Sequence, residues 1–344
     1  MRLQTLTVQH IRTHRSYTIR FNDTVTLITG KNGSGKTSLL EAVTIALRGS
    51  SFRSADATVL QKGTEWFRID LLTSEGLRTV KFDNRTATKK KTFTIDHKIN
   101  YRLIERSKYP VVLFEPDDLR ITDGSPTRRR DYLDTMISQF DSQYIATVRK
   151  YERALFQRNK LLKSSTVNHD VLFPWNVLLS EYGQTIINKR RALVYSLNQI
   201  VTEVYQTIAP KKDTISLGYT YDIDVTSGRL LHDYESVYER DMMLKTTTVG
   251  PHRHDMSVLI NGNKAADTAS RGENRTIVLS LKFIEAMLVE KMTGKKPIIL
   301  LDDVFSELDD DRQKLLLKEF HENQVIMTSA STKSRSVRHI VSLS

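Results

Sequence analysis

The chain has 344 residues and no cysteine, and its formal net charge at pH 7 is +12. Its length predicts one large domain or two, and the missing thiols exclude disulfides, cysteine zinc sites and thiol catalysis. No apolar run is long enough to cross a bilayer and no signal-peptide core is present, so we expect a cytoplasmic protein. The positive charge favours a polyanionic partner, either nucleic acid or an anionic membrane surface.

Residues 1–29 predict a β-hairpin that leads into a buried strand. Apolar and polar residues alternate through the first part, and Val25–Thr29 is a short β-prone run. Between the two hairpin strands lie Arg12, Thr13 and His14. They form either an ordinary polar turn or a nucleotide contact, because the turn precedes the next motif and can fold back over it.

A phosphate-binding loop follows the strand, and we expect a helix directly after it over residues 38–47. Glycines let successive backbone N–H groups face one anion, and the helix N-terminus adds partial positive charge. We expect Lys36 to reach the β- and γ-phosphates of ATP as a catalytic residue, and the Thr37 hydroxyl to ligate Mg²⁺. The predicted ATP-binding residues of the loop are Gly30, Lys31, Asn32, Gly33, Ser34, Gly35, Lys36 and Thr37.

Short strands are predicted between residues 51 and 114. Residues 67–72 and 78–82 flank a turn, and Val111–Phe114 is a buried-strand candidate. The charge run Lys89, Lys90 and Lys91 lies in a probable hairpin. It is either a solvated face or a contact to the DNA backbone.

From Phe114 onward the pattern becomes helical. Apolar residues recur at helical spacing over 126–163 and again over 175–208, with a break around 168–174. Two long antiparallel helices joined by a short loop would form a compact arm. Their basic residues serve either solubility or a face that follows phosphates: Arg128, Arg129, Arg130, Arg149, Lys150, Arg153, Arg158, Lys160, Lys163, Lys189, Arg190 and Arg191.

Residues 213–262 return to strand character, and a sharp Gly250-Pro251 bend lies within them. His252, Arg253, His254 and Asp255 follow the bend. A metal site is possible on composition, but a structural turn that supports the nucleotide site is the preferred interpretation.

The last hundred residues predict the second half of a phosphate-loop site. Ser270 and Gly272 lie at the start of an amphipathic helix, where they form either an ordinary N-cap or an anion-ready N-terminus. The apolar strand at 298–301 ends in Asp302, expected in the Mg²⁺ shell, and Asp303, expected to orient the attacking water. Residues 306–309 open another helix, and 325–328 form a last strand from which Thr328 or Ser329 approaches the γ-phosphate.

These motifs together resemble the head of ABC-type ATPases. The large insertion between the phosphate loop and the Ser270 signature resembles the SMC and RecF branch, and its short length without Cys-x-x-Cys resembles the RecF family. Two positions depart from that family's pattern, with Glu273 in place of Gln and His254 in place of an acid. Segments similar to RecF are residues 114–119, Pro126 with Arg128, Arg129 and Arg130, Leu133 with Asp134, Gln157 to Asn159 with Leu161 and Leu162, and Gly250 to Arg253.

The resemblance implies an α/β fold with mixed sheets around a phosphate-loop core, plus a largely helical second lobe. The head would comprise residues 1–113 and 245–344, and the helical arm lobe 114–244. Two copies would dock head to tail around ATP, with Ser270 supplied in trans. Gly272 and, from the turn near the N-terminus, Arg12 are the other candidate ATP contacts outside the loop. Because Asp303 is shorter than the Glu of transporter heads, we expect slow, DNA-stimulated hydrolysis.

The same resemblance implies a role in recombinational repair and replication-fork maintenance. The dimer would bind single- and double-stranded DNA at gaps and junctions, through backbone contacts, and help RecR with RecO to load RecA. It would have no membrane partner. The alternatives are a transporter cassette, against which the basic arm argues, and a nucleotide-gated nuclease, which needs an acid cluster that the sequence does not offer.

Overall fold

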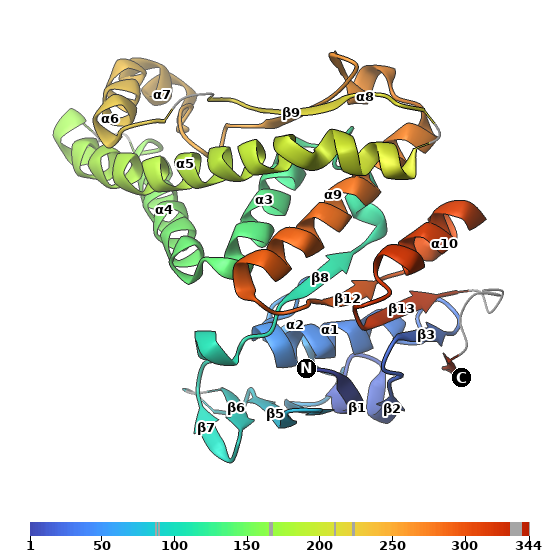
Figure 1. Cartoon of the computed structure of the whole chain (residues 1–344). Helices are drawn as coiled ribbons and strands as arrows, with labels where there is room; N and C mark the ends of the chain where they lie inside the picture. The colour runs from blue at the N-terminus through green and yellow to red at the C-terminus, as the bar shows by residue number, and fades with distance from the viewer. Residues whose placement is uncertain are drawn as a thin grey trace. The chain divides into compact units, whose positions relative to one another are not determined.

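The computed structural model describes residues 1–86, 88, 90–164, 168–209, 211–221, 224–330 and 339–343, with the side chains of residues 306 and 307 left aside. The chain divides into two compact units. We call Met1–Asp118 with Glu285–Ser344 the head unit, and Leu119–Ile284 the arm unit. Figure 1 labels the helices and strands of both units.

The first sheet of the head unit is antiparallel and has the order β2-β1-β4-β5-β6-β7. The hairpin expected near the N-terminus is confirmed, since Leu6 faces Ile19 and Val8 faces Tyr17 across it. The pair expected over 67–72 and 78–82 is confirmed as well. The strands are β1 (Leu3–Ile11), β2 (His14–Arg20), β4 (Trp66–Thr73), β5 (Gly76–Asp83), β6 (Lys91–Ile95) and β7 (Lys98–Asn100).

The second sheet is parallel and has the order β14-β3-β13-β12-β8. Because its strands run in one direction, their carboxyl ends meet at one edge, where ligands of such sheets bind. The expectation that 325–328 is the last strand was wrong, because β14 follows it and pairs with β3. The strands are β3 (Val25–Thr29), β8 (Val111–Phe114), β12 (Ile298–Leu301), β13 (Val325–Ser329) and β14 (Ile340–Ser342).

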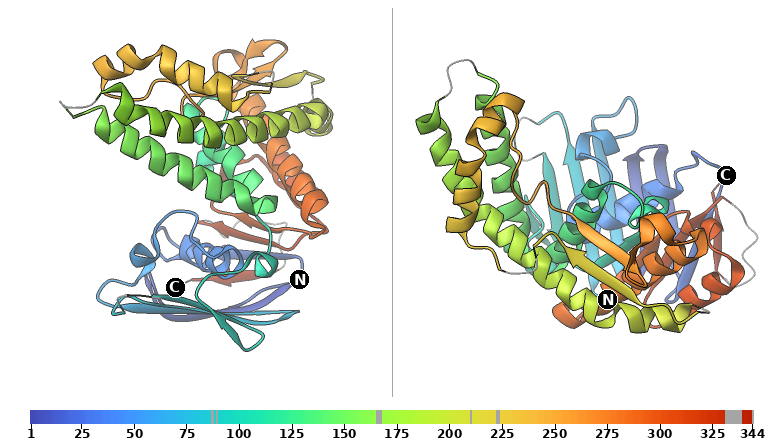
Figure 2. Two further views of the ribbon diagram at one scale, coloured as in Figure 1. Left: turned by 90° about the vertical axis from the view of Figure 1, so that its left-hand side faces the viewer. Right: turned by 90° about the horizontal axis from the view of Figure 1, so that it is seen from above.

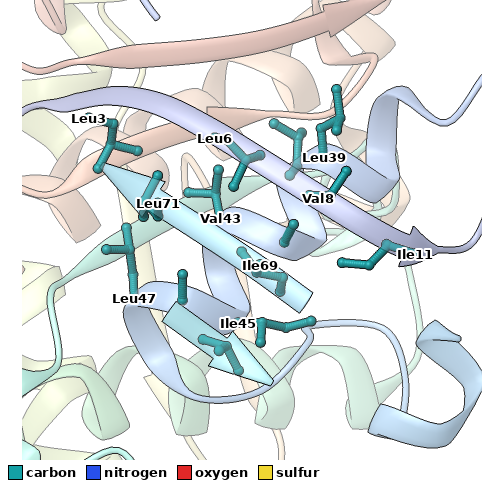
Figure 3. Close-up of a cluster of buried hydrophobic side chains, with 14 of the residues drawn as sticks. Leu3, Leu6, Val8, Ile11, Leu39, Val43, Ile45, Leu47, Ile69 and Leu71 are labelled. Atoms are coloured by element: carbon teal, nitrogen blue, oxygen red, sulfur yellow. The ribbon is translucent and has the colours of Figure 1, made fainter. Parts of the chain in front are cut away.

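Helix α1 (Lys36–Arg48) lies between the two sheets and is buried along most of its length (Figure 3). Leu39 and Val43 pack with Leu6 and Ile69 of the antiparallel sheet in the main apolar cluster. Such a buried helix anchors the loop before it, because core side chains pack at crystal-like density. The remaining head elements are α2 (Asp56–Val59), η1 (Glu105–Ser107), η2 (Pro116–Arg120), η3 (Val304–Glu307) and α10 (Asp310–Glu319).

The described residues between 126 and 208 form three long helices where the sequence pattern indicated two: α3 (Pro126–Phe140), α4 (Ser142–Leu161) and α5 (His169–Ile208). The first expected helix is broken at Asp141, whose side chain caps α4. The second starts earlier than expected, because Asn168 caps it and Pro174 lies inside its second turn. Helices α4 and α5 pack along each other (Figure 2).

The expected strand character of 213–262 holds only at its ends. Two helices, α6 (Ser227–Ser236) and α7 (Tyr238–Leu244), lie between the strands β9 (Ile215–Tyr219) and β10 (Met256–Ile260). Because β10 pairs with β9, residues 245–284 make their contacts in the arm unit, whereas the sequence analysis assigned them to the head. The other elements are β11 (Asn263–Lys264), α8 (Ala265–Thr268) and α9 (Arg271–Thr293). Among the described residues, no helix has the length and apolar character needed to span a membrane.

Candidate nucleotide-binding site

The phosphate loop connects the end of β3 to the start of α1. Gly33 and Gly35 have φ of 84° and 96°, a left-handed conformation that glycine adopts without steric cost. Gly35 is the N-cap of α1, and within the described part of the chain no side chain caps this helix and no acid lies in its first turn. Its first backbone N–H groups and its positive dipole end are therefore available to an anion.

The loop also has the shape of a phosphate cradle. The Ser34 hydroxyl is buried and has no hydrogen-bond partner among the described residues. A Cβ at Gly30 would lie 2.7 Å from that hydroxyl, and a Cβ at Gly35 would collide with Thr13 and His14. The residues present thus fit a triphosphate, which would give the buried hydroxyl a partner.

The turn at residues 12–14 folds against this loop. His14 Nε2 lies 3.1 Å from the Gly35 carbonyl oxygen, and Thr13 is next to it. Arg12, the residue singled out from sequence, points elsewhere. Its guanidinium donates to both Glu41 oxygens of α1, at 3.1 and 3.2 Å, and to the Ser54 hydroxyl at 2.7 Å. The structure brings Thr13 and His14, rather than Arg12, to the loop.

Lys36 directs its ammonium group into the loop. Its Nζ donates to the carbonyl oxygens of Gly30 and Lys31, at 3.0 and 3.3 Å, and the side chain is 5% exposed. Carbonyl oxygens hold the ammonium without neutralising it. The charge therefore remains available to phosphate oxygens at the mouth of the loop.

The two acids expected after the apolar strand lie at the same edge as the loop. The Thr37 hydroxyl donates to Asp302 Oδ1 and Oδ2, at 2.8 and 3.0 Å, although 265 positions separate the two residues. Thr328 of β13 donates to Asp302 Oδ1 at 2.8 Å and accepts from the Asp303 N–H at 2.9 Å. A hydroxyl beside a buried carboxylate is the oxygen donor set that Mg²⁺ takes in phosphate-loop proteins.

Asp303 adopts a left-handed backbone conformation with φ of 53° at the end of the strand. Burial raises the pKa of Asp303, the neighbouring Asp302 charge adds to that shift, and Lys36 opposes it. A carboxylate with a raised pKa is a better proton acceptor than an exposed one. This environment suits the water-orienting role expected from the sequence.

Two charged residues that the sequence analysis gave no role belong to this site. Arg53 Nη2 donates to Asp302 Oδ2 at 2.7 Å, and Arg53 Nε donates to Glu115 Oε1 at 3.0 Å. Burial raises the pKa of Glu115, and the bond from Arg53 opposes that shift. Arg53 lies in a connecting segment without a motif, so only its position in the fold reveals it.

Comparison with known proteins decides the family. Residues 5–199 match a family model described as an AAA domain. The DNA replication and repair protein RecF of Ruminiclostridium cellulolyticum is 33% identical over 343 residues, covering 95% of this chain and 92% of the relative. RecF of Streptococcus gordonii is 32% identical over 340 residues, covering 96% and 93%. The chain belongs to the RecF family.

Solved structures agree with this assignment. A structure of the recombination mediator protein RecF with ATP, in the RecFOR pathway, has a TM-score of 0.83 at 30% identity, covering 98% of this chain and 93% of the other. A second RecF structure, described as RecF-ATPrS, has a TM-score of 0.88 at 28% identity, covering 99% and 96%. An Smc head from Pyrococcus yayanosii has a TM-score of 0.52 at 12% identity, covering 95% and 92%, and shares the fold. The expected ABC-type ATPase head is thereby confirmed.

The signature segment of this RecF-family chain forms a closed helix cap in the arm unit. The Ser270 hydroxyl accepts from the Glu273 N–H at 3.2 Å, and Glu273 Oε2 accepts from the Ser270 N–H at 2.8 Å. The bonds from Ser270 hold the pKa of Glu273 below its ordinary value. Gly272 lies in the first turn of α9, beside this cap.

The turn at residues 246–255 is built from buried polar contacts. His252 Nδ1 accepts from the Tyr151 hydroxyl at 2.6 Å, and its Nε2 donates to the Thr247 carbonyl oxygen at 3.1 Å. Burial lowers the pKa of His252 to about 4, which keeps the ring neutral. Among the described residues, no group of three or more histidines and acids is placed to hold a metal ion. The contacts of His252 are those of a side chain that braces a turn.

Several basic residues of the RecF-family arm are committed to internal ion pairs. Arg158 is fully buried and pairs with Asp241 at 2.6 Å, and Arg190 pairs with Asp134 at 2.7 Å. These residues, which the sequence analysis counted toward a phosphate-following face, instead hold the arm together. Arg149, Lys150, Arg153 and Lys160 of α4 are exposed and are the candidates for that face.

The lysine run near residue 90 is only partly described. Lys89 lies outside the described residues. Lys91 is on β6 and pairs with Asp56 at 2.5 Å, with 12% of its side chain exposed. It stabilises the head unit internally and is not a candidate for DNA contact. Lys90 is exposed and donates to the Asn84 side chain at 3.0 Å.

Proposed function

We propose that this chain is an ATP-dependent DNA-binding protein of recombinational repair and replication-fork maintenance. The observation that carries the proposal is the contact of Thr37 with Asp302 beside an uncapped helix N-terminus. That geometry suits Mg²⁺–ATP, and the RecF relatives whose descriptions name ATP and the RecFOR pathway support it.

Each residue of the site has a distinct task in this proposal. The loop amides and Lys36 bind the phosphates, and Thr37 with Asp302 holds Mg²⁺, which supplies charge neutralisation when bound. Thr328 contacts both acids and fixes their relative position. Asp303 orients the attacking water and takes its proton. Because an aspartate reaches less far than a glutamate, hydrolysis is slow, below the median enzyme turnover of about 10 per second.

Nucleotide binding is proposed to control pairing of two chains. Ser270 and Gly272 of a second copy would contact the γ-phosphate, so that each ATP lies between two heads. The paired chains would bind gapped or junction DNA through exposed basic side chains on backbone phosphates. Release would follow hydrolysis, and RecR with RecO would join the DNA-bound dimer to load RecA.

Light scattering on the purified chain tests this proposal. With saturating ATP, Mg²⁺ and a gapped duplex, the molar mass of the protein should double, and fluorescence anisotropy should show tighter DNA binding than without ATP. The DNA should stay intact, which separates the proposal from a nuclease. A chain that remains monomeric under these conditions would contradict it, and recovery in membrane fractions would favour a transporter cassette.

A further inference from the structure

The segment that follows α1 holds Arg53 against two carboxylates of the head unit. Arg53 Nη2 lies 2.7 Å from Asp302, which directly follows β12, and 3.0 Å from Glu115, which directly follows β8. The Arg53 side chain is 41% exposed, whereas that of Asp302 is 2% exposed. One end of the ion pair is thus fixed and buried, and the other is free to move toward solvent.

The backbone at Arg53 is anchored, so movement is confined to its side chain. The Ser51 hydroxyl donates to Glu41 at 2.7 Å and accepts from the Arg53 N–H at 3.0 Å. Arg12 donates to Glu41, the acceptor of Ser51, and to the hydroxyl of Ser54, the residue after Arg53. Arg12, expected from sequence to touch nucleotide, therefore positions the segment that carries Arg53.

The guanidinium and a divalent cation need the same carboxylate. A buried, ionised Asp302 requires a positive partner, because an uncompensated buried charge is costly. In this structure Asp302 accepts from Thr37, Thr328 and Arg53, and Arg53 supplies the charge. A metal ion held by Thr37 and Asp302 would supply that charge instead, and two cations on one carboxylate repel each other.

We propose that Arg53 competes with the divalent cation for Asp302, and that Glu115 receives the guanidinium when the metal binds. This inference rests on the proposed function, and it makes Arg53 a positioning residue that sets how strongly metal binding depends on nucleotide. Without phosphates the guanidinium keeps Asp302. Phosphate oxygens add ligands to the metal, so metal and nucleotide bind together.

The first experiment removes the Arg53 guanidinium, which is proposed to compete with the metal ion for Asp302. We compare the wild-type chain with Arg53→Gln, and follow binding of a fluorescent ATP analogue while Mg²⁺ is titrated. The Mg²⁺ midpoint should fall about tenfold in the variant, a coupling of ordinary size. Without nucleotide, Mn²⁺ detected by electron paramagnetic resonance should also bind more tightly. Arg68→Gln, which removes an arginine paired with Asp70 on β4, is the matched control and should leave the midpoint unchanged.

The second experiment tests the role of Glu115. Glu115→Gln should raise the Mg²⁺ midpoint in the wild-type background, because the displaced guanidinium loses its acceptor. In the Arg53→Gln background the same change should have little effect. Simple loss of one negative charge would raise the midpoint equally in both backgrounds, and this result would overturn the proposal.

Folding is checked by circular dichroism, and Arg53→Lys is the reserve variant if Arg53→Gln fails to fold. A lysine retains the charge but loses the two-carboxylate geometry, so a smaller fall in midpoint is expected. An unchanged or raised midpoint in a folded variant would overturn the role of Arg53. A wild-type chain that binds no analogue at any Mg²⁺ concentration would instead overturn the proposed function.

Discussion

Helices α1 and α9 both begin at a segment that the sequence analysis judged ready for an anion, yet the structure builds the two N-termini differently. Helix α1 starts at Gly35 with no side-chain cap and no acid in its first turn. Helix α9 starts after Ser270, where Glu273 and Ser270 cap each other. The first terminus presents free donors, and the second has already satisfied part of its donors internally.

The difference has an electrostatic consequence. A carboxylate in the first turn of a helix interacts favourably with its dipole, and it repels any other anion that approaches. A γ-phosphate at α1 meets the positive end of the helix and the Lys36 ammonium, whereas the same group at α9 of another copy meets the Glu273 carboxylate. Binding and pairing are therefore expected to differ in strength, with the phosphate loop dominant.

The largest effect is expected at α1. Lys36→Ala should weaken ATP binding about 100-fold, because loss of one partner from a desolvated charge contact costs several kcal/mol. Isothermal titration with an ATP analogue measures the change. Lys62→Ala, at an exposed lysine of the head unit outside the loop, should have little effect. Equal losses of ATP affinity in the two variants would show that ATP binding at the uncapped N-terminus of α1 does not depend on the Lys36 charge.

The second-largest effect is expected on the ATP-dependent pairing of two chains. Ser270→Arg should abolish the ATP-dependent doubling of molar mass while ATP binding by the monomer persists, because the larger side chain blocks the approach of α9 to a second head. Light scattering gives the mass. Ser196→Arg, at an exposed serine of α5, is the control. A Ser270→Arg variant that still pairs with ATP would refute the trans role of α9.

A smaller effect is expected when the α9 cap loses its charge. Glu273→Gln keeps an oxygen that can accept from the Ser270 N–H, and it removes the repulsion of a γ-phosphate. Dimer affinity with ATP should rise about threefold, in line with ~0.3–1 kcal/mol for a charge at a helix terminus. Sedimentation equilibrium measures it, with Glu290→Gln at the other end of α9 as control. Weaker pairing would mean that the carboxylate assists the contact.

The smallest expected effect depends on pH. The pKa of Glu273 is lowered in the folded chain. Its carboxylate therefore stabilises the α9 cap fully at pH values above 4.5, the ordinary pKa of a glutamate. That contribution is lost as the pH falls through the folded pKa. A nuclear magnetic resonance titration should place the Glu273 midpoint below 4.5, and Ser270→Ala should move it upward. A midpoint above 4.5 would contradict the cap.

The sequence predicted the local features and missed those created by distant pairings. Residues 25–37 and 298–303 follow patterns set by neighbouring residues, so the strand, loop, helix and acids were all predictable. No sequence motif marks Arg53, because its partners, Glu115 and Asp302, follow strands β8 and β12 and are distant from it in the sequence. Arg12 was considered as a nucleotide contact, whereas its partner in the structure, Glu41, faces it only once β1 packs on α1.

The second unit was harder to predict for the same reason. Helices α6 and α7 lie in a stretch whose flanks are β-prone, and nothing local shows that β10 joins β9. A break was expected around residues 168–174, but Asn168 caps α5, which begins at His169 and contains Pro174. The cap of α9 was readable in part, since serine followed by glutamate three residues later is a capping pattern.

The order of strands in the parallel sheet has a consequence for synthesis of the chain. Strand β3, which positions the phosphate loop, pairs with β13 and β14, whose residues come about 300 positions later. At about 5–20 residues per second, a ribosome needs roughly 15–60 s to deliver those partners. Both hydrogen-bonding edges of β3 lack their partner strands during that time, so the sheet that positions the phosphate loop can form only when translation is nearly finished.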